Sequence, residues 1–481
     1  MKLFGRIIPA VFIFCGGLLL AQDAGSPLTT QGMDQFFLTG VRARGMGGTV
    51  LAIGGDANSV FSNPSLLTSV KNMNVRIGGS SVFSTYKQRQ EWHPDEYYAE
   101  LSLVIEGTIR NVIDTLAQKL ARPFDTITPD NEMNTTRTFP AQFSVSLPFE
   151  LFETKLNVSA GVTEEISLNT YFQNNNVLDP NIGAYRPSPV IRPKVGDSTK
   201  VQWYQFVRER SGSVNGYVIG GAVDVVENLT IGVSGTLYDG SSDDVQRRVD
   251  RGTFVLKTNN SSGFNVMRND SIYKHVTTTG TSDYSGMNGT IAGAYHNEVF
   301  TVSAVVNTPL ELTREWKQTT QQDSMGSSFS SAKNGKEKIS IPLQYSFGIS
   351  LRPSSKVTVG IDYMIRSFDE MKYSGSDTTV SHWLNSSFLR AGIEYSPSKW
   401  IAIRAGFREN VQTFAAAGAG ILNDPVRGSV YTFGLGTKFE SVSIDAAYEY
   451  SLTKYVDAWE SNLNYNTIQS HNIMVELGYQ F

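Results

Sequence analysis

The 481-residue sequence contains 41 basic and 45 acidic side chains, one cysteine, 18% charged residues and 11% aromatic residues. This small negative net charge excludes the basic surface of a nucleic-acid-binding protein, so no nucleic-acid partner is expected. Beyond residue 21 no apolar run approaches the roughly 18 residues that a membrane-spanning helix needs. A large secreted β protein and a transmembrane barrel remain, and the 21 Tyr and 26 Phe favour the barrel, because these rings populate strands and membrane interfaces.

The first 21 residues have the pattern of a secretory signal peptide. Lys2 and Arg6 precede an apolar run from Ile7 to Leu20, and cleavage after Ala21 is expected. The only cysteine, Cys15, lies inside this run. We therefore predict a signal peptide at 1–21 and an exported chain without disulfides.

A glycine-rich segment from Gly40 to Leu67, within an expected N-terminal tail and plug at 22–72, follows neither helical nor strand periodicity for long. Its Gly45-Met46-Gly47-Gly48 run lacks the preceding strand and following helix of a phosphate site. Glycine permits tight turns and close backbone contact, and Asx and proline residues fix local turns. A plug folded into the mouth of a narrow barrel needs these properties. Its candidate residues are Gly40, Arg42, Gly45, Gly47, Gly48, Asp56, Asn58, Asn63 and Pro64.

One segment near 99–121 departs from strand patterning. In LSLVIEGTIRNVIDTLAQKL the apolar residues recur at i, i+3 and i+4, which predicts an amphipathic helix. This predicted helix follows the first expected strand of the barrel, which places it in the first long external loop. Its apolar stripe either packs on neighbouring loops or offers a groove for a ligand.

From residue 73 to the carboxyl end, apolar and polar residues alternate in repeated short runs. In IMVELGYQF, Ile473, Val475 and Leu477 face one side, and the chain ends on Tyr479 and Phe481. The same pattern in IPLQYSFGISL places Ile341 through Leu351 outward at every second position, and VTVGIDYMI, IAIRAGF and VSIDAAYEYSL repeat it. Period-2 alternation indicates strands with one apolar face, which meets lipid in a barrel.

Short and long connections alternate between these strands. Short polar turns are expected near 150–155, 225–229, 296–298, 353–356, 397–399 and 440–441, and long hydrophilic links at 173–200, 239–275, 319–336 and 453–470. This asymmetry is typical of an outer-membrane barrel. The fold class predicted is all-β: a transmembrane antiparallel barrel of about 14 strands over 73–481, with the N-terminal plug inside.

The alternation places charged residues in the lumen. They are Asp362, Arg390, Glu394, Arg404, Arg408, Lys438, Asp445, Glu449 and Glu476. Isolated charges in a narrow tube are costly, so we expect them to pair, bracing the wall and anchoring Arg42 or Asp56 of the plug. Alternatively, Arg390, Arg404 or Arg408 holds a ligand carboxylate. Tryptophans, among them Trp316, Trp383 and Trp400, suit two interfacial belts.

No enzymatic or metal chemistry is expected. The five histidines are scattered, and the chain lacks any His-x-x-x-His pair. We therefore assign no catalytic, metal or cofactor site.

The run G-x-R-A-x-G-M-G-G, followed by L-A-I-x-x-D-A-N-S-V-F-x-N-P-S-x-L, resembles the amino-terminal hatch of the FadL/TodX family of outer-membrane channels for hydrophobic compounds. The carboxyl third of the chain resembles that family too. Ser65 departs from the alanine usual there. The related PorV-like barrels, which are partners in protein secretion, share a similar opening and remain an alternative.

The resemblance implies a hydrophobic-compound channel, for instance for long-chain fatty acids, in the outer membrane of a Gram-negative-type bacterium. The cargo is captured at the external loops, passes the hatch and leaves through the wall at a kinked third strand. In LNVSAGVTEEISL that kink is assigned to Gly161. Expected partners are outer-membrane lipids, a hydrophobic small molecule and the barrel assembly machinery, which would read Tyr479 and Phe481. The oligomeric state stays open, with a monomer favoured.

Overall fold

The computed structural model describes residues 40–92, 131–151, 154–175, 198–260, 263–269, 274–324, 326–374, 383–414, 424–459 and 462–481. The predicted signal peptide at 1–21, the tail up to residue 39 and the predicted helix at 99–121 lie outside these ranges. Within them, no helix is long and apolar enough to cross a membrane.

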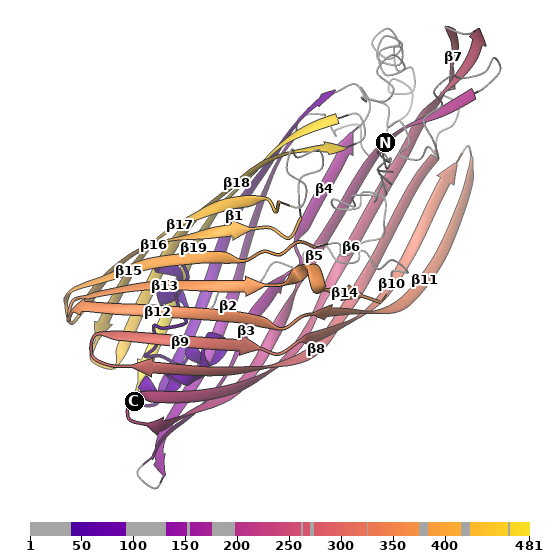
Figure 1. Ribbon diagram of the computed structural model, residues 1–481. Helices are drawn as coiled ribbons and strands as arrows, with labels where there is room; N and C mark the ends of the chain where they lie inside the picture. The colour runs from indigo at the N-terminus through magenta and orange to yellow at the C-terminus, as the bar shows by residue number, and fades with distance from the viewer. Residues whose placement is uncertain are drawn as a thin grey trace, which may run out of the picture.

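The chain forms one antiparallel sheet that closes on itself, because β1 pairs with both β2 and β19 (Figure 1). Nineteen strands make up the sheet, and five of them (β4, β8, β10, β12 and β14) continue the preceding strand after a short break. The barrel therefore has 14 strands, which confirms the predicted all-β antiparallel barrel and its strand number.

The first half of the barrel contains β1 (Asn74–Trp92), β2 (Asn131–Leu151), β3 (Thr154–Ser167), β4 (Thr170–Asn175), β5 (Ser198–Val226), β6 (Leu229–Asn260), β7 (Gly263–Asn269), β8 (Lys274–His296) and β9 (Phe300–Asn307). The second half contains β10 (Leu310–Ser324), β11 (Ser327–Ile341), β12 (Gln344–Ser354), β13 (Val357–Arg366), β14 (Lys372–Tyr373), β15 (Phe388–Ser398), β16 (Ile401–Val411), β17 (Arg427–Phe439), β18 (Val442–Trp459) and β19 (Asn462–Gln480). A 3-10 turn, η2 (Phe368–Glu370), lies between β13 and β14.

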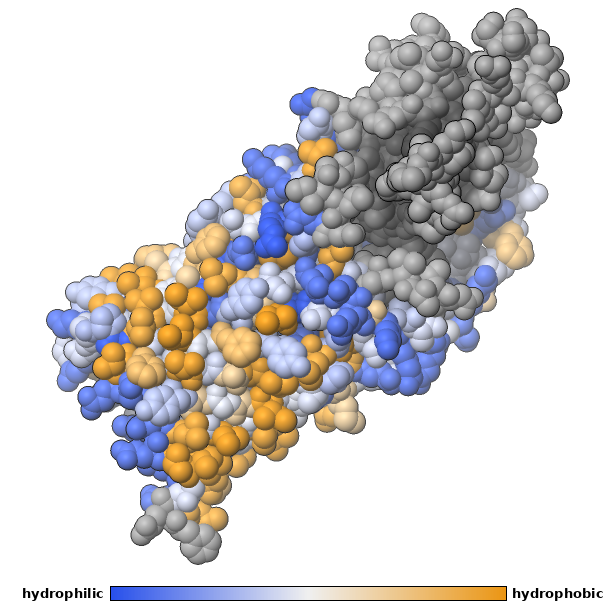
Figure 2. Space-filling model, in the orientation of Figure 1, coloured by the Kyte–Doolittle hydropathy of each residue, from blue (hydrophilic) through white to orange (hydrophobic). Residues whose placement is uncertain are grey.

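The outer wall carries an apolar belt. Along β19, Ile473, Val475 and Leu477 are about half exposed, whereas Met474 and Glu476 between them are buried. Figure 2 shows such apolar side chains as a band toward the short-turn end of the visible face, with hydrophilic residues beyond it. The predicted alternation is confirmed here, and the polar face lines the lumen.

All six short turns lie where the sequence predicts them, between β2 and β3, β5 and β6, β8 and β9, β12 and β13, β15 and β16, and β17 and β18. We call this end of the barrel the lower end. The long links were wrong in part, because 239–260, 319–324, 327–336 and 453–459 continue as strands. Above the belt the outward faces of β10 and β11 are largely polar, so apolar alternation no longer marks these strands.

Two placements of apolar residues differ from the sequence expectation. Ile341 is 1% exposed and faces the lumen, because the break at 342–343 reverses the alternation between β11 and β12. Trp383 is buried within the lumen rather than at an interface. Trp316 is half-buried and donates from Nε1 to Glu337 Oε1 at 2.9 Å. Trp400, in contrast, is exposed beside a lower turn.

Candidate functional site

The lower half of the lumen is occupied by residues 40–70, which we call the N-terminal segment (Figure 1, indigo). It contains two short helices, α1 (Val41–Gly45) and α2 (Ser59–Ser62), and a 3-10 helix, η1 (Pro64–Ser69). Met46, Ala57, Val60 and Leu67 have no exposed surface. Buried backbone amides and carbonyls need hydrogen-bond partners. Wall side chains accept hydrogen bonds from several of the segment's backbone amides, as the contacts below show.

Glycines on both sides allow close contact between segment and wall. Gly47 and Gly48 adopt left-handed conformations, with φ of 71° and 86°, which other residues rarely take. The wall glycine opposite is Gly406, where a Cβ atom would lie 2.1 Å from the backbone nitrogen of Gly47. At Gly392 a Cβ would lie 2.1 Å from the Met46 carbonyl oxygen. The wall therefore contains a seat for the glycine run.

Arg42 joins the segment to the wall through a two-pronged ion pair. Its Nε and Nη2 donate to the Glu394 carboxylate at 2.9 and 2.7 Å. Burial alone would lower the pKa of Arg42, but the Glu394 carboxylate outweighs it and holds that pKa above its ordinary value. Glu394 also accepts from Arg404 Nε at 2.6 Å, and Arg404 reaches Asp445 Oδ1 at 2.6 Å.

Arg44 forms a second anchor. Its Nε donates to Glu449 Oε1 at 2.7 Å, and its Nη2 contacts the other carboxylate oxygen. The same carboxylate accepts from Arg408 at 2.6 and 3.2 Å. Each of Glu394 and Glu449 thus lies between one arginine of the segment and one of the wall.

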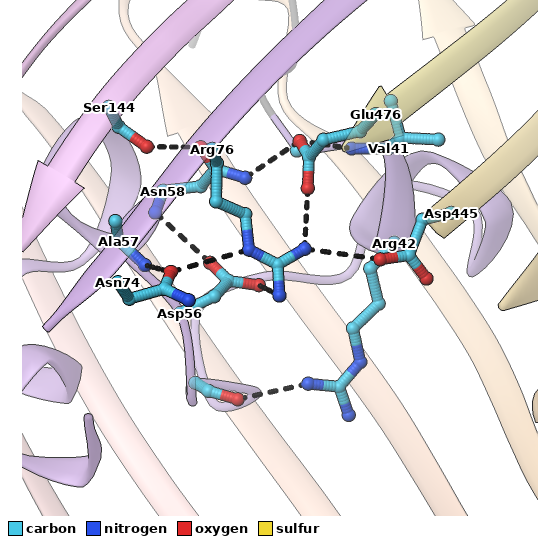
Figure 3. Close-up of polar contacts among 12 residues, drawn as sticks. Val41, Arg42, Asp56, Ala57, Asn58, Asn74, Arg76, Ser144, Asp445 and Glu476 are labelled. Atoms are coloured by element: carbon cyan, nitrogen blue, oxygen red, sulfur yellow. Dashed lines mark hydrogen bonds and ion pairs between the residues drawn. The ribbon is translucent and has the colours of Figure 1, made fainter. Parts of the chain in front are cut away.

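A third cluster surrounds Arg76 on β1 (Figure 3). Arg76 Nη1 contacts Glu476 Oε1 at 2.6 Å and Asp445 Oδ2 at 3.1 Å. Its Nη2 lies 3.9 Å from Asp56 Oδ2 of the segment. Arg76 therefore pairs with two wall carboxylates at the point where a third carboxylate, that of Asp56, approaches.

Asn58 completes this cluster with two side-chain hydrogen bonds, one to a carboxylate and one to a hydroxyl group (Figure 3). Its Nδ2 donates to Glu476 Oε2 at 2.9 Å, and its Oδ1 accepts from Ser144 Oγ at 2.8 Å. Gly40 N donates to Gln142 Oε1 at 2.8 Å. Asn63 instead acts within the segment: its Oδ1 accepts from Ser65 N at the start of η1, where Pro64 is the first residue.

Asp362 and Arg390 bind the backbone of the segment. Asp362 Oδ2 accepts from Val50 N at 2.7 Å and Leu51 N at 3.0 Å. Arg390 Nη1 donates to the Gly48 carbonyl at 3.1 Å. Since Arg404 and Arg408 already pair with wall carboxylates, the geometry favours bracing over ligand binding for the lower lumen.

The lumen has a different character above this polar level. Inward residues from six strands meet the connection that follows β13, and together they form what we call the apolar cluster. Its buried members are Ile166, Leu168, Val214, Tyr238, Tyr284, Leu310, Leu312, Ile339, Ile341, Phe368, Met371 and Trp383. Sequence reasoning expected a charged lumen and missed this cluster, because breaks at 168–169, 308–309 and 342–343 reset the alternation that it relied on.

A buried ion network lies next to the apolar cluster. Asp244 accepts from Arg210 Nε at 2.7 Å, and its other oxygen lies 3.1 Å from Arg314 Nη2. Tyr284 of the apolar cluster lies 3.4 Å from Ser242 Oγ, which donates to Asp244 at 3.1 Å. The sequence offered little signal for Ser242 and Asp244, since 239–275 was expected to be a loop.

The wall between β2 and β3 is paired only in its lower part. Their register runs from Leu151↔Thr154 to Gln142↔Thr163, and within the described ranges none joins 131–141 to 164–175. The ladder of β3 with β5 shifts register between Glu164 and Ile166. No ladder hydrogen bonds therefore join β2 to β3 across this stretch of the wall within the described residues.

Gly161, the residue assigned to the kink, lies just below that stretch in a regular part of the ladder, opposite Ser144 and Val218. A Cβ atom there would lie 2.5 Å from Phe61 Cζ of the N-terminal segment. The structure therefore places the irregularity three to five residues beyond Gly161. Gly161 itself makes room for Phe61.

Tyr479 and Phe481 were predicted as the terminal residues that the barrel assembly machinery reads. Tyr479 and Phe481 at the carboxyl end are exposed on the outer wall, and their rings lie 4.6 Å apart in an edge-on arrangement. Arg44 of the segment and Arg76 and Gln142 of the wall take part in these contacts but were not singled out from the sequence. Arg76 could have been found by extending the alternation to NVRIGGSSVF in β1.

Comparison with known proteins shows likeness of fold. No family model matches the sequence, and no curated protein matches it. Among solved structures, a FadL homologue from Pseudomonas aeruginosa superposes with a TM-score of 0.61 at 11% identity, covering 93% of this chain and all of the other. The Pseudomonas putida toluene transporter TodX gives 0.57 at 13% identity, covering 91% of this chain and 97% of the other. The monoaromatic hydrocarbon channel CymD gives 0.54 at 13% identity, covering 93% and 99%. The chain has the fold of these FadL/TodX-like channels.

Proposed function

We propose that the protein is an outer-membrane channel for hydrophobic small molecules in a Gram-negative-type bacterium. The observation that carries this proposal is the apolar cluster enclosed in the upper lumen of a barrel whose lower lumen is filled and polar. The FadL-like fold supports it, and the named functions of TodX and CymD point to the same class of cargo. Transport, rather than catalysis, is the activity.

The N-terminal segment acts in this proposal as the plug, with residues 22–72 as tail and plug and 73–481 as barrel. Arg42, Arg44 and Asn58 hold it to three different carboxylates of the wall. Such a filled lower lumen gives ions and sugars no continuous water path. An apolar cargo that reached it would also meet charged groups, so downward passage is disfavoured.

Cargo binding is assigned to the apolar cluster. Each CH₂ group transferred from water gains about 0.8 kcal/mol, so long-chain or aromatic solutes favour such surroundings. Fatty acids and monoaromatic compounds are the two cargo types that this reasoning allows. Phe368 and Trp383 contribute to the cluster from the connection after β13, so we expect these two side chains to shift when cargo arrives.

Release is assigned to the unpaired stretch of wall between β2 and β3. Ile166 and Leu168 of the apolar cluster lie in that stretch, which joins the binding region to the wall. On the outer face of β2, exposed Phe143 and Leu147 mark the apolar belt directly below it. The cargo would thus leave the lumen beside lipid. Outer-membrane lipids and the barrel assembly machinery, which would read Tyr479 and Phe481, are the partners proposed.

Binding of an uncharged naphthylamine dye to the purified protein tests the cargo assignment. Leu312→Asp places a carboxylate in the apolar cluster and should weaken saturable dye binding by at least about 30-fold, since burying an unpaired charge costs several kcal/mol. Ile349→Asp on the lipid face is the matched control for barrel perturbation. Equal dye affinity in Leu312→Asp and the wild type, with both proteins folded, contradicts the assignment. A secretion partner of the PorV type would instead co-purify with secretion components and bind no dye.

A further inference from the structure

The unpaired stretch between β2 and β3 contains an ion pair between the two strands. Arg137 of β2 donates from Nη1 to Glu164 Oε1 of β3 at 2.6 Å, and its Nη2 contacts the other carboxylate oxygen. This is a two-pronged, planar contact, the strongest geometry available to these groups. It lies above Thr163, the last residue of β3 that pairs with β2.

Local irregularities on both strands bring these side chains together. The register of β1 with β2 shifts between Gly78 and Gly79, which leaves Ala141 as an extra residue in β2. The register of β3 with β5 shifts between Glu164 and Ile166. Bulges change the direction of side chains and end strand pairing. Here each of the two strands has one directly above the point where the β2–β3 ladder stops.

The surroundings of the pair hold it in place. The guanidinium carbon of Arg137 lies 4.1 Å from the centroid of the Phe139 ring, a cation–π distance. The Glu164 side chain is 4% exposed, whereas that of Arg137 is 31% exposed. Glu164 is therefore fixed inside the wall, whereas Arg137 can swing out into solvent, which leaves the buried Glu164 carboxylate without this partner.

We propose that Arg137 and Glu164 form a latch that holds β2 and β3 together where backbone pairing is missing, and that opening this latch sets the rate at which cargo leaves through the wall. The inference rests on the proposed channel function. It assigns to these two residues a positioning role rather than contact with cargo. Because Arg137 is partly exposed and Glu164 is buried, opening returns the guanidinium to water but leaves the carboxylate unpaired, so the latch is closed most of the time and opens transiently.

Dye uptake by cells of a Gram-negative host tests the latch. An uncharged naphthylamine dye is excluded by lipopolysaccharide and fluoresces on reaching the phospholipid beneath. Glu164→Gln should raise the uptake rate about fivefold over the wild type, the change that loss of a partly exposed ion pair allows. The charge reversal Arg137→Glu with Glu164→Arg should return the rate to that of the wild type.

Glu132→Gln is the matched control, because Glu132 of β2 pairs with Lys87 of β1 at 2.9 Å across two strands that are already hydrogen-bonded. It should leave uptake unchanged. In a Cys15→Ser background, Arg137→Cys with Glu164→Cys should lose uptake when a bis-methanethiosulfonate reagent links the two thiols through disulfide bonds, with release of methanesulfinate, and recover it on reduction. Uptake that ignores the linker, or that rises equally in Glu132→Gln and Glu164→Gln, overturns the latch. Wild-type cells no faster than cells without the protein overturn the channel function and the latch with it.

Discussion

Substitution of a wall glycine tests whether the N-terminal segment is seated by close backbone contact. A Cβ added at Gly406 would lie 2.1 Å from Gly47 N and 2.3 Å from the Met46 carbonyl carbon, whereas ordinary contact begins at 3.4 Å. The overlap is with backbone, which no side-chain rotation relieves. Gly406→Ala should therefore favour displacement of the segment over a small local adjustment.

The magnitude follows from the cost of overpacking. Inserting one methyl group into a filled core costs about 1–3 kcal/mol, and rigid backbone on both sides places Gly406→Ala near the upper end. About 3 kcal/mol corresponds to roughly a 100-fold change in the ratio of displaced to seated segment. Gly392→Ala meets the Met46 carbonyl oxygen at 2.1 Å and should act in the same direction.

Single-channel conductance in planar bilayers provides the assay. The wild type should show small, infrequent openings, and Gly406→Ala should show openings that are about 100-fold more frequent. Gly235→Ala is the control, because a Cβ there has no neighbour within 4 Å. If Gly406→Ala and Gly235→Ala conduct alike, and protease cuts the segment equally in both, the seat does not hold the segment.

Two further outcomes are expected. Glu394→Gln removes the carboxylate shared by Arg42 and Arg404 and should lower the free energy of unfolding by about 2 kcal/mol. The loss is smaller than for a fully buried pair because Arg42 is partly exposed. The control Glu315→Gln removes the carboxylate of an exposed pair with Lys336 and should change the free energy of unfolding by under about 0.5 kcal/mol in the same denaturant titration. Equal losses in the two variants would contradict the bracing role. Deletion of 26–67 should leave a folded barrel that leaks small sugars in liposome-swelling measurements, because Glu394, Glu449 and Glu476 each keep a wall arginine as partner; an unchanged swelling rate would show that the segment does not block the lumen.

The sequence predicted the barrel well because two solvents act on every strand of the belt. Ile473, Val475 and Leu477 meet lipid and Glu476 meets the lumen, so each strand carries a period-2 signal. The short turns were predicted for a related reason, since polar turn residues interrupt that signal at the lower end. Above the belt no apolar face is required, and β6, β10 and β11 therefore extended beyond the predicted limits.

The candidate site was predictable only where chemistry is local. The glycine run and Asn63-Pro64 predict a tightly folded segment, and strand alternation predicts that Glu394 and Glu449 face the lumen. Which carboxylate faces which arginine depends on pairing between strands several hundred residues from the segment, and alternation alone does not encode it. The apolar cluster was missed for a different reason: Ile341 begins a run that reads as outward-facing, but the break between β11 and β12 separates it from that run and leaves it facing inward.

The most direct test of the account compares two solutes in the same cells. Its central claim is that apolar cargo reaches the upper lumen and leaves through the wall, while the lower lumen stays closed to water-soluble solutes. Host cells that express the wild type should take up the naphthylamine dye several times faster than control cells and take up a small sugar no faster. Accelerated sugar uptake without any gain in dye uptake would contradict the account.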